Sequence, residues 1–293
     1  LRVLDCSYNE QLALPEALPA ALEDLDCSQV QVTTGTLPPL PDSLLSLDCN
    51  GNSLISLPTP LPPTLRSLSC GSNELTILPP LPSSLTDVYC EGNHLTALPE
   101  PLPPNLTLLD CGDNDLRKLP LTLPNTLRNL NCQKQRSRWL ETLPELPVEL
   151  DQLRCDSAGL LSLPPLPATL TVLNCSNNAL TSLGPLPSRL RSLVCSDNML
   201  EVLPFLPRWL TDLNCAGNRL TSLPRLPDRL AELTCHGNIG LGALLELPYY
   251  SLQSLQCDAA ALNFAVLKHL QLLSVLKIHT LGGEVLDIPC SRG

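Results

Sequence analysis

The chain has few aromatic residues and no long run of apolar residues. Phe, Trp and Tyr make up only 3% of its 293 positions, so we do not expect a globular core built around packed rings. No apolar run approaches the roughly twenty residues that a membrane-spanning helix requires. We therefore predict a core made of leucine layers and no membrane span.

Basic residues are also scarce. The 18 Lys and Arg residues oppose 29 Asp and Glu residues, which gives a formal net charge of −11. A nucleic-acid binder needs a basic track along its surface, and an anionic membrane surface repels a chain of this charge. Both are therefore disfavoured as partners.

Cysteine, in contrast, is frequent and regularly spaced. Thirteen of the 14 cysteines recur from Cys6 to Cys257 at steps of 20 to 23 residues, and Asn follows three residues later in nine cases. Around each Cys the chain follows the pattern L-x-x-L-x-C-x-x-N-x-L-x-x-L-P-x-L-P. This is a leucine-rich repeat, in which each turn has a short parallel strand, an Asn-anchored bend and a return segment.

The spacing predicts which residues are buried. In the fourth turn Leu68 and Cys70 lie two apart, so on an extended strand both point into the core, while Ser67 and Ser69 face outward. The Asn of the bend is placed to bond backbone groups of its own and neighbouring turns. The Leu-Pro-x-Leu-Pro segment cannot be helical, so we expect an extended, polyproline-like convex side.

The repeats cover nearly the whole chain. We predict an α/β-solenoid, a leucine-rich repeat horseshoe of about 13–14 turns with a parallel β-sheet on its concave face. It forms a single domain, 1–293, with regular repeats over 1–257 and a degenerate final repeat and cap over 258–293. Leu276 and Ile278 continue the strand frame, and the proline-free segment Asp258–His269 has helix-like spacing. Because Leu1 already opens a strand, we interpret the chain as a fragment of a longer protein.

The evenly spaced cysteines allow three readings. We favour a row of thiols in the core, because neighbouring parallel strands lie about 4.8 Å apart and a disulfide needs its Cβ atoms closer. Metal binding is disfavoured, since the sequence has no Cys-x-x-Cys pair to bring thiols together. Redox chemistry is the third reading, with Cys290, outside the ladder, as its best candidate. Many free thiols suit a reducing compartment.

The residue before each ladder Cys forms an outward column along the strands. Its N-terminal third is acidic, which would steer a basic partner; the alternative is a solvated face that only maintains solubility. The candidate partner-binding residues in this column are Asp26, Asp48, Tyr89 and Asp110.

One irregularity interrupts the repeats. The step from Cys132 to Cys155 is 23 residues, and the ladder Asn is replaced by Gln135 and then by Ala158. Arg and Trp, which are enriched at interface hot spots, gather in a predicted basic loop and beside it. The candidate binding residues here are Arg128, Lys134, Arg136, Arg138, Trp139 and Arg154. Repeat decay without a binding role is an equally weighted alternative. Elsewhere, Phe205 with Trp209 and Tyr249 with Tyr250 are expected to be packing residues.

The turns Leu163–Leu180 and Leu203–Leu220 resemble the short bacterial class of leucine-rich repeat found in secreted effectors of the IpaH, SspH, SlrP and YopM type. The resemblance extends over essentially the whole chain. It implies a domain that recognises host proteins, is secreted by bacteria and acts in the host cytoplasm. Three features depart from the family pattern: the sequence shows no helical N-terminal cap, no ligase-sized region follows the repeats, and Cys replaces the usual Val of the core almost throughout.

Many members of that family also carry a C-terminal ubiquitin-ligase domain with a catalytic Cys in a C-x-D motif. Cys111-Gly112-Asp113 and Cys195-Ser196-Asp197 spell this motif, but both cysteines lie on the ladder, where a thiolate would lack solvent access and an electropositive neighbour. We predict no catalytic residue, no metal and no cofactor in this chain.

The sequence therefore predicts a non-enzymatic module that binds a partner protein through the concave face and the mid-array basic loop. Two alternatives stay open. The chain could be the substrate-recognition domain of a bacterial effector ubiquitin ligase whose catalytic domain is absent from it. It could also be a scaffold that self-associates end to end through an uncapped N-terminal strand edge.

Overall fold

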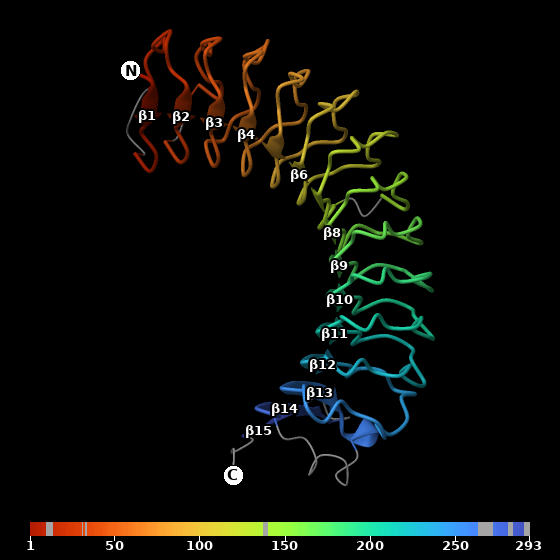
Figure 1. Ribbon diagram of the computed structural model, residues 1–293. Coiled ribbons are helices and arrows are strands. Elements are labelled where there is room, and N and C mark those ends of the chain that lie inside the picture. Colours follow the sequence, from red (N-terminus) through yellow and green to blue (C-terminus); the bar gives the residue numbers. More distant parts are fainter. Residues whose placement is uncertain are drawn as a thin grey trace. The chain divides into compact units, whose positions relative to one another are not determined.

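The computed structural model describes residues 1–9, 14–30, 32, 34–136, 140–262, 272–280 and 284–289. It divides into two compact units, Leu1–Leu150 and Asp151–Gly293. The single domain expected over 1–293 therefore stays a prediction. Each unit is a stack of similar turns, with the strands along one side and the proline-rich return segments along the other (Figure 1). We call these sides the strand face and the return face.

In its described residues the first unit has seven parallel strands, each three residues long. Every strand pairs with the next in a fixed register; Leu68 lies opposite Val88, and Ser69 opposite Tyr89. The strands are β1 (Val3–Asp5), β2 (Asp24–Asp26), β3 (Ser46–Asp48), β4 (Ser67–Ser69), β5 (Asp87–Tyr89), β6 (Leu108–Asp110) and β7 (Asn129–Asn131).

The second unit continues the same arrangement and then changes it. Its parallel strands are β8 (Gln152–Arg154), β9 (Val172–Asn174), β10 (Ser192–Val194), β11 (Asp212–Asn214), β12 (Glu232–Thr234), β13 (Ser254–Asp258) and β14 (Val275–His279). Ile278 pairs with Cys257, which confirms the predicted degenerate turn. The final strand β15 (Val285–Pro289) pairs antiparallel to β14, which the repeat pattern did not predict.

The helix expected over Asp258–His269 is only partly within the described residues. Asp258 still belongs to β13, and one 3₁₀ turn, η1, spans Ala259–Ala261. The prediction is thus wrong for Asp258, which pairs with His279. The residues from 263 to 269 lie outside the described part of the chain.

The predicted pattern of burial is confirmed in both units. The middle residue of β2 to β12 is buried in every strand, and each of the thirteen ladder cysteines is buried as well. The flanking strand residues are mostly half-buried on the strand face. Because successive residues of a strand point to opposite sides, each turn adds one Leu and one Cys to the same layer of the core.

Buried Asn side chains join successive turns. The Asn93 amide Nδ2 donates to the carbonyl oxygens of Cys70 at 3.0 Å and Cys90 at 3.1 Å. Its Oδ1 accepts the backbone N–H of Leu75 at 3.0 Å. Asn93 is fully buried, so these bonds satisfy groups that water cannot reach. One side chain therefore ties its own turn to the preceding one.

Gln135 keeps this bonding although it is not Asn. Its Nε2 donates to the carbonyls of Cys111 and Cys132 at 3.1 and 3.2 Å, and its Oε1 accepts the Leu116 N–H at 2.9 Å. The replacement therefore does not break the amide ladder in the first unit. Ala158, in the second unit, has no amide to offer, but its own N–H donates to Asn178 Oδ1 of the next turn at 3.2 Å.

The cysteine side chains occupy a dry layer. The Cys49 thiol donates to the Ser69 carbonyl at 3.3 Å, and Cys90 makes the same contact with Asp110. Burial raises the pKa of Cys27 and Cys215 from 9.0 to about 12. These groups therefore stay protonated at neutral pH and act as small apolar side chains.

We predict that Asn93→Leu destabilises the first unit, whereas Asn93→Gln has a much smaller effect. Leucine leaves the Cys70 and Cys90 carbonyls and the Leu75 N–H without their partner, at a cost of about 1–3 kcal/mol for each orphaned group. Glutamine can bond as Gln135 does. Chemical denaturation followed by circular dichroism measures both; an unchanged transition for Asn93→Leu would refute the ladder's role.

We also predict that stability falls in alkali because of the core thiols. The folded-state pKa of Cys27 and Cys215 lies above the unfolded value, so their contribution is complete below about pH 9 and is lost as the pH rises toward about 12. In that window each thiol lowers the free energy of unfolding by about 1.4 kcal/mol per pH unit. Between about pH 8 and about pH 11, the free energy of unfolding should fall less in the Cys27→Ala/Cys215→Ala variant than in the unchanged protein. Equal losses in both proteins would contradict the prediction.

Candidate functional site

The acidic column of the first unit lies on the strand face, as predicted, but its carboxylates also hold the backbone. Asp26 Oδ1 accepts the Ser28 N–H at 2.9 Å and the Ser28 hydroxyl at 2.7 Å. Asp48 Oδ1 accepts the Asn50 N–H at 3.0 Å. Such bonds to the residue two positions on form Asx turns. The column therefore favours Asp or Asn for a structural reason.

Asp110 makes the same turn and a further bond across strands. Its Oδ1 accepts the Gly112 N–H at 3.1 Å, and its Oδ2 accepts Asn131 Nδ2 at 2.9 Å. The sequence carried a signal for these turns, because Asp or Asn recurs directly before the ladder Cys. These carboxylates are thus backbone acceptors as well as surface charges.

Tyr89 differs from its column neighbours because it is surrounded by carboxylates. Burial raises its pKa, followed by the charges of Asp87, Asp110 and Glu91. The same crowding acts on Glu91, whose pKa is raised by burial and then by Asp110 and Asp48. The strand face here combines an aromatic ring with concentrated negative charge, which suits a cationic partner group.

The basic residues of the predicted loop are partly neutralised within the first unit. Arg136 Nε donates to Asp113 Oδ1 at 3.0 Å, and one of its terminal nitrogens lies 3.1 Å from His94 Nδ1. Arg128 lies 3.8 Å from Glu149. Lys134 has a left-handed backbone with φ of 52°, at the bend position that Gly92 and Gly217 hold in two other turns. Arg138 and Trp139 lie outside the described residues.

Arg154 is the one candidate in the second unit. It occupies the column position at the end of β8 and is exposed. The structure thus brings Asp48, Tyr89 and Asp110 onto one face and places Arg136 beside Asp113 and His94.

The C-x-D cysteines are poorly suited to catalysis. Cys111 and Cys195 are fully buried, and burial is the main cause that raises their pKa. Asp113 of the first motif is paired with Arg136. A buried, protonated thiol is a weak nucleophile. Within the described residues no cluster of three His, Cys, Asp or Glu side chains is arranged to hold a metal ion.

The expectation that Phe205 is a packing residue is wrong. Its side chain is 94% exposed, and Tyr250 is 77% exposed. Trp209 is 38% exposed and lies under two guanidinium groups, those of Arg208 and Arg229. The sequence analysis did not predict this Arg–Trp contact. Arg208 and Arg229 do lie close to the prolines of two successive turns, Pro207 and Pro227.

No helix in the described ranges is long and apolar enough to cross a membrane.

Parallel strands of three residues, a buried amide ladder and proline-rich return segments define a leucine-rich repeat protein. YopM from Yersinia pestis, a leucine-rich effector protein, shares 32% identity with the chain over 95% of its length and 78% of that protein, with a TM-score of 0.82. YopM from Yersinia enterocolitica shares 34% identity over 92% of the chain and 61% of its own length, with a TM-score of 0.70. The chain belongs to this family of bacterial leucine-rich repeat effectors.

A further likeness concerns the fold alone. The functional domain of InlJ from Listeria monocytogenes, which includes a cysteine ladder, is 24% identical over 81% of this chain and 64% of that domain, with a TM-score of 0.57. No protein-family model and no curated protein matches the chain.

We predict that Asp26→Ala destabilises the first unit and that Asp26→Asn does not. Alanine removes the acceptor of the Ser28 N–H and hydroxyl, and each lost bond costs about 0.5–1.5 kcal/mol. Asparagine retains an oxygen in the same place. Thermal unfolding of both variants measures the difference; equal destabilisation would show that charge, and not the Asx turn, determines the residue.

Proposed function

We propose that this chain is a protein-binding module whose strand face in the first unit engages a basic protein surface. The observation that carries the proposal is Tyr89 among Asp87, Asp110 and Glu91, on strands whose column continues with further aspartates. The aspartates of the column also accept backbone N–H groups, but the Tyr89 side chain takes no part in the amide or cysteine ladder. The identity of residue 89 is therefore available for recognition.

The basic loop supplies a second element of the proposed interface. Arg136 is held by Asp113 at 3.0 Å, so its guanidinium is oriented before a partner arrives, which lowers the entropic cost of binding. Lys134 adds a charge two residues earlier in the same turn. We propose that Arg138 and Trp139 complete this element with the residue types that dominate interface hot spots.

The family membership supports a setting for this activity. Both YopM chains are similar to this one over more than nine tenths of its length. We propose that the protein is secreted by bacteria and binds a host protein in the host cytoplasm. Its many buried cysteines suit such a reducing compartment.

Affinity capture from a eukaryotic cell lysate, read by mass spectrometry, tests the proposal. The Asp26→Asn/Asp48→Asn/Asp110→Asn variant removes charge but keeps the acceptors of the Asx turns. At low salt this variant should capture much less of the partner than the unchanged protein does, because charge steers and orients the encounter. The Arg136→Ala/Arg138→Ala/Trp139→Ala variant tests the loop in the same way.

A matched control removes the same charge from the return segments. Glu16, Glu100 and Glu145 each follow a proline and are exposed, so replacing all three by Gln should leave capture unchanged. Capture that is equal in all variants would contradict the assignment to the strand face and the loop. Loss in the control alone would move the site to the return face.

A further inference from the structure

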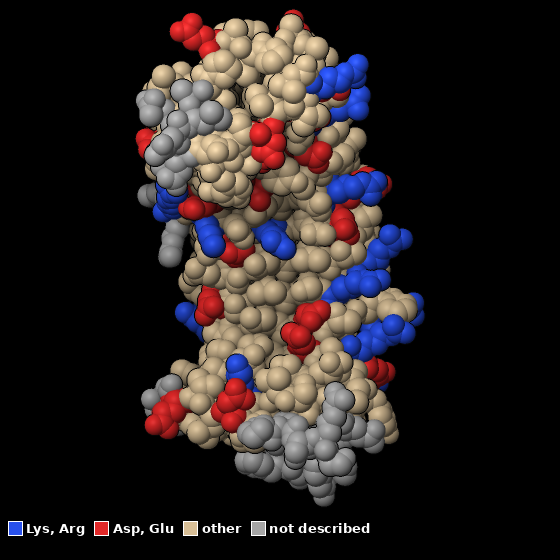
Figure 2. All heavy atoms as spheres, turned by 90° about the vertical axis from the view of Figure 1, so that its left-hand side faces the viewer, with Lys and Arg blue, Asp and Glu red and all other residues tan. Residues whose placement is uncertain are grey.

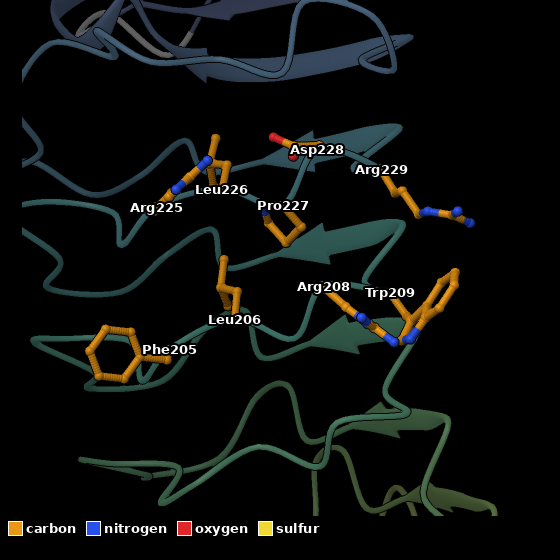
Figure 3. Close-up of a pocket in the computed structure, with 9 residues that line it drawn as sticks. All are labelled: Phe205, Leu206, Arg208, Trp209, Arg225, Leu226, Pro227, Asp228 and Arg229. Carbon is orange, nitrogen blue, oxygen red and sulfur yellow. The ribbon is translucent and has the colours of Figure 1, made fainter.

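Two consecutive turns of the second unit enclose an open hollow of about 640 Å³. It lies between the segments Phe205–Trp209 and Arg225–Arg229, each of which leads into a strand, β11 and β12 respectively. Both segments share the pattern x-Leu-Pro, so Phe205 and Arg225 occupy equivalent places in successive turns. Figure 3 shows Phe205 near one end of the labelled side chains and Trp209 near the other.

The indole of Trp209 orients two arginines. The Cζ atom of Arg229 lies 4.2 Å from the ring centroid, and that of Arg208 lies 4.9 Å from it. A guanidinium over a ring face is attracted by the ring quadrupole and keeps its N–H groups available at its edge. The stacking therefore fixes the two cations while their hydrogen-bond donors stay accessible.

These arginines have no acidic partner in the described part of the chain. Arg208, Arg225 and Arg229 are all exposed, and the ion pairs among the described residues involve other basic groups. The hollow has one carboxylate, that of Asp228. Figure 2 shows basic side chains along the right-hand edge of the visible face, with acidic side chains beside some of them. In a chain with a net charge of −11, the exposed Arg208, Arg225 and Arg229 concentrate positive charge at the hollow.

The aromatic side chains of the hollow are exposed as well. Phe205 is 94% exposed, although burying a Phe side chain is strongly favourable. Trp209 is 38% exposed. An extended peptide in the hollow could cover both rings while its carboxylates meet the arginines, since planar Arg–carboxylate pairs form two parallel hydrogen bonds.

We propose that this hollow is a second binding site, separate from the strand face of the first unit, for an extended acidic protein segment that carries an apolar side chain. Its carboxylates bond to Arg208, Arg229 and Arg225, and its apolar group covers Phe205. A nucleic-acid strand fits less well, because it bears a charge at every step, whereas a peptide can place an uncharged residue opposite Asp228.

Fluorescence anisotropy with a labelled octapeptide, EELEELEE, tests the site on the full chain. We expect saturable binding that weakens at least about tenfold in Arg208→Gln/Arg229→Gln, because two charge-assisted contacts are lost. Arg66→Gln/Arg219→Gln removes the same charge from exposed positions away from the hollow and should bind like the unchanged protein. Phe205→Ser, which keeps every arginine, should also weaken binding.

Two further probes test whether the hollow prefers an acidic peptide to a neutral peptide or to a nucleic acid. The peptide QQLQQLQQ and an eight-nucleotide oligo(dT) should bind more weakly than the acidic peptide. The Asp26→Asn/Asp48→Asn/Asp110→Asn variant should keep peptide binding, which separates this site from the proposed strand-face function. No saturable binding of the acidic peptide up to about 1 mM, equal binding of the neutral peptide, or tighter binding of the oligonucleotide would overturn the proposal.

Discussion

The amide side chain at the bend of most turns makes the interaction on which the other features depend. A strand of three residues makes few hydrogen bonds, and the bend that follows it leaves further backbone groups to be satisfied. Asn73 compensates by donating to the carbonyls of Cys49 and Cys70 and accepting the N–H of Leu54. Each such residue satisfies buried groups of two turns at once, so no turn is complete without the next.

This arrangement separates the residues that build the stack from those that face outward. The inward Leu and Cys positions and the bend amide determine the fold, which leaves the strand face and the return segments open to variation. The separation is incomplete, because Asp26, Asp48 and Asp110 serve the backbone as well as the surface. Tyr89 makes no Asx turn, so this structural role does not explain its identity.

The repeat spacing predicts the burial of Leu68 and Cys70, the strand register and the extended return segments, because these features recur in every turn. The spacing does not predict contacts that occur only once, between one residue and a residue of the next turn some twenty positions away. Gln135 keeps the ladder because its longer side chain still reaches the Cys111 carbonyl, which residue type alone does not reveal.

The same reason explains the errors in the second unit. We expected Phe205 to pack, yet it is 94% exposed, and the contact of Trp209 with Arg229 joins successive turns. The antiparallel β15 follows the last repeat and has no earlier copy in the chain to compare it with. Candidate sites were hardest to predict where charge pairs form between turns, as between Arg136 and Asp113.

Native-state hydrogen exchange measures the amide ladder most directly. The N–H groups of Leu54, Leu75 and Leu95 donate to side-chain oxygens of Asn73, Asn93 and Asn114, while the N–H groups of Cys70 and Cys90 donate to neighbouring strands. If the ladder holds the stack, both sets should show the same high protection and open in one cooperative step. Fast exchange at the three leucines, with the cysteine amides still protected, would contradict the account.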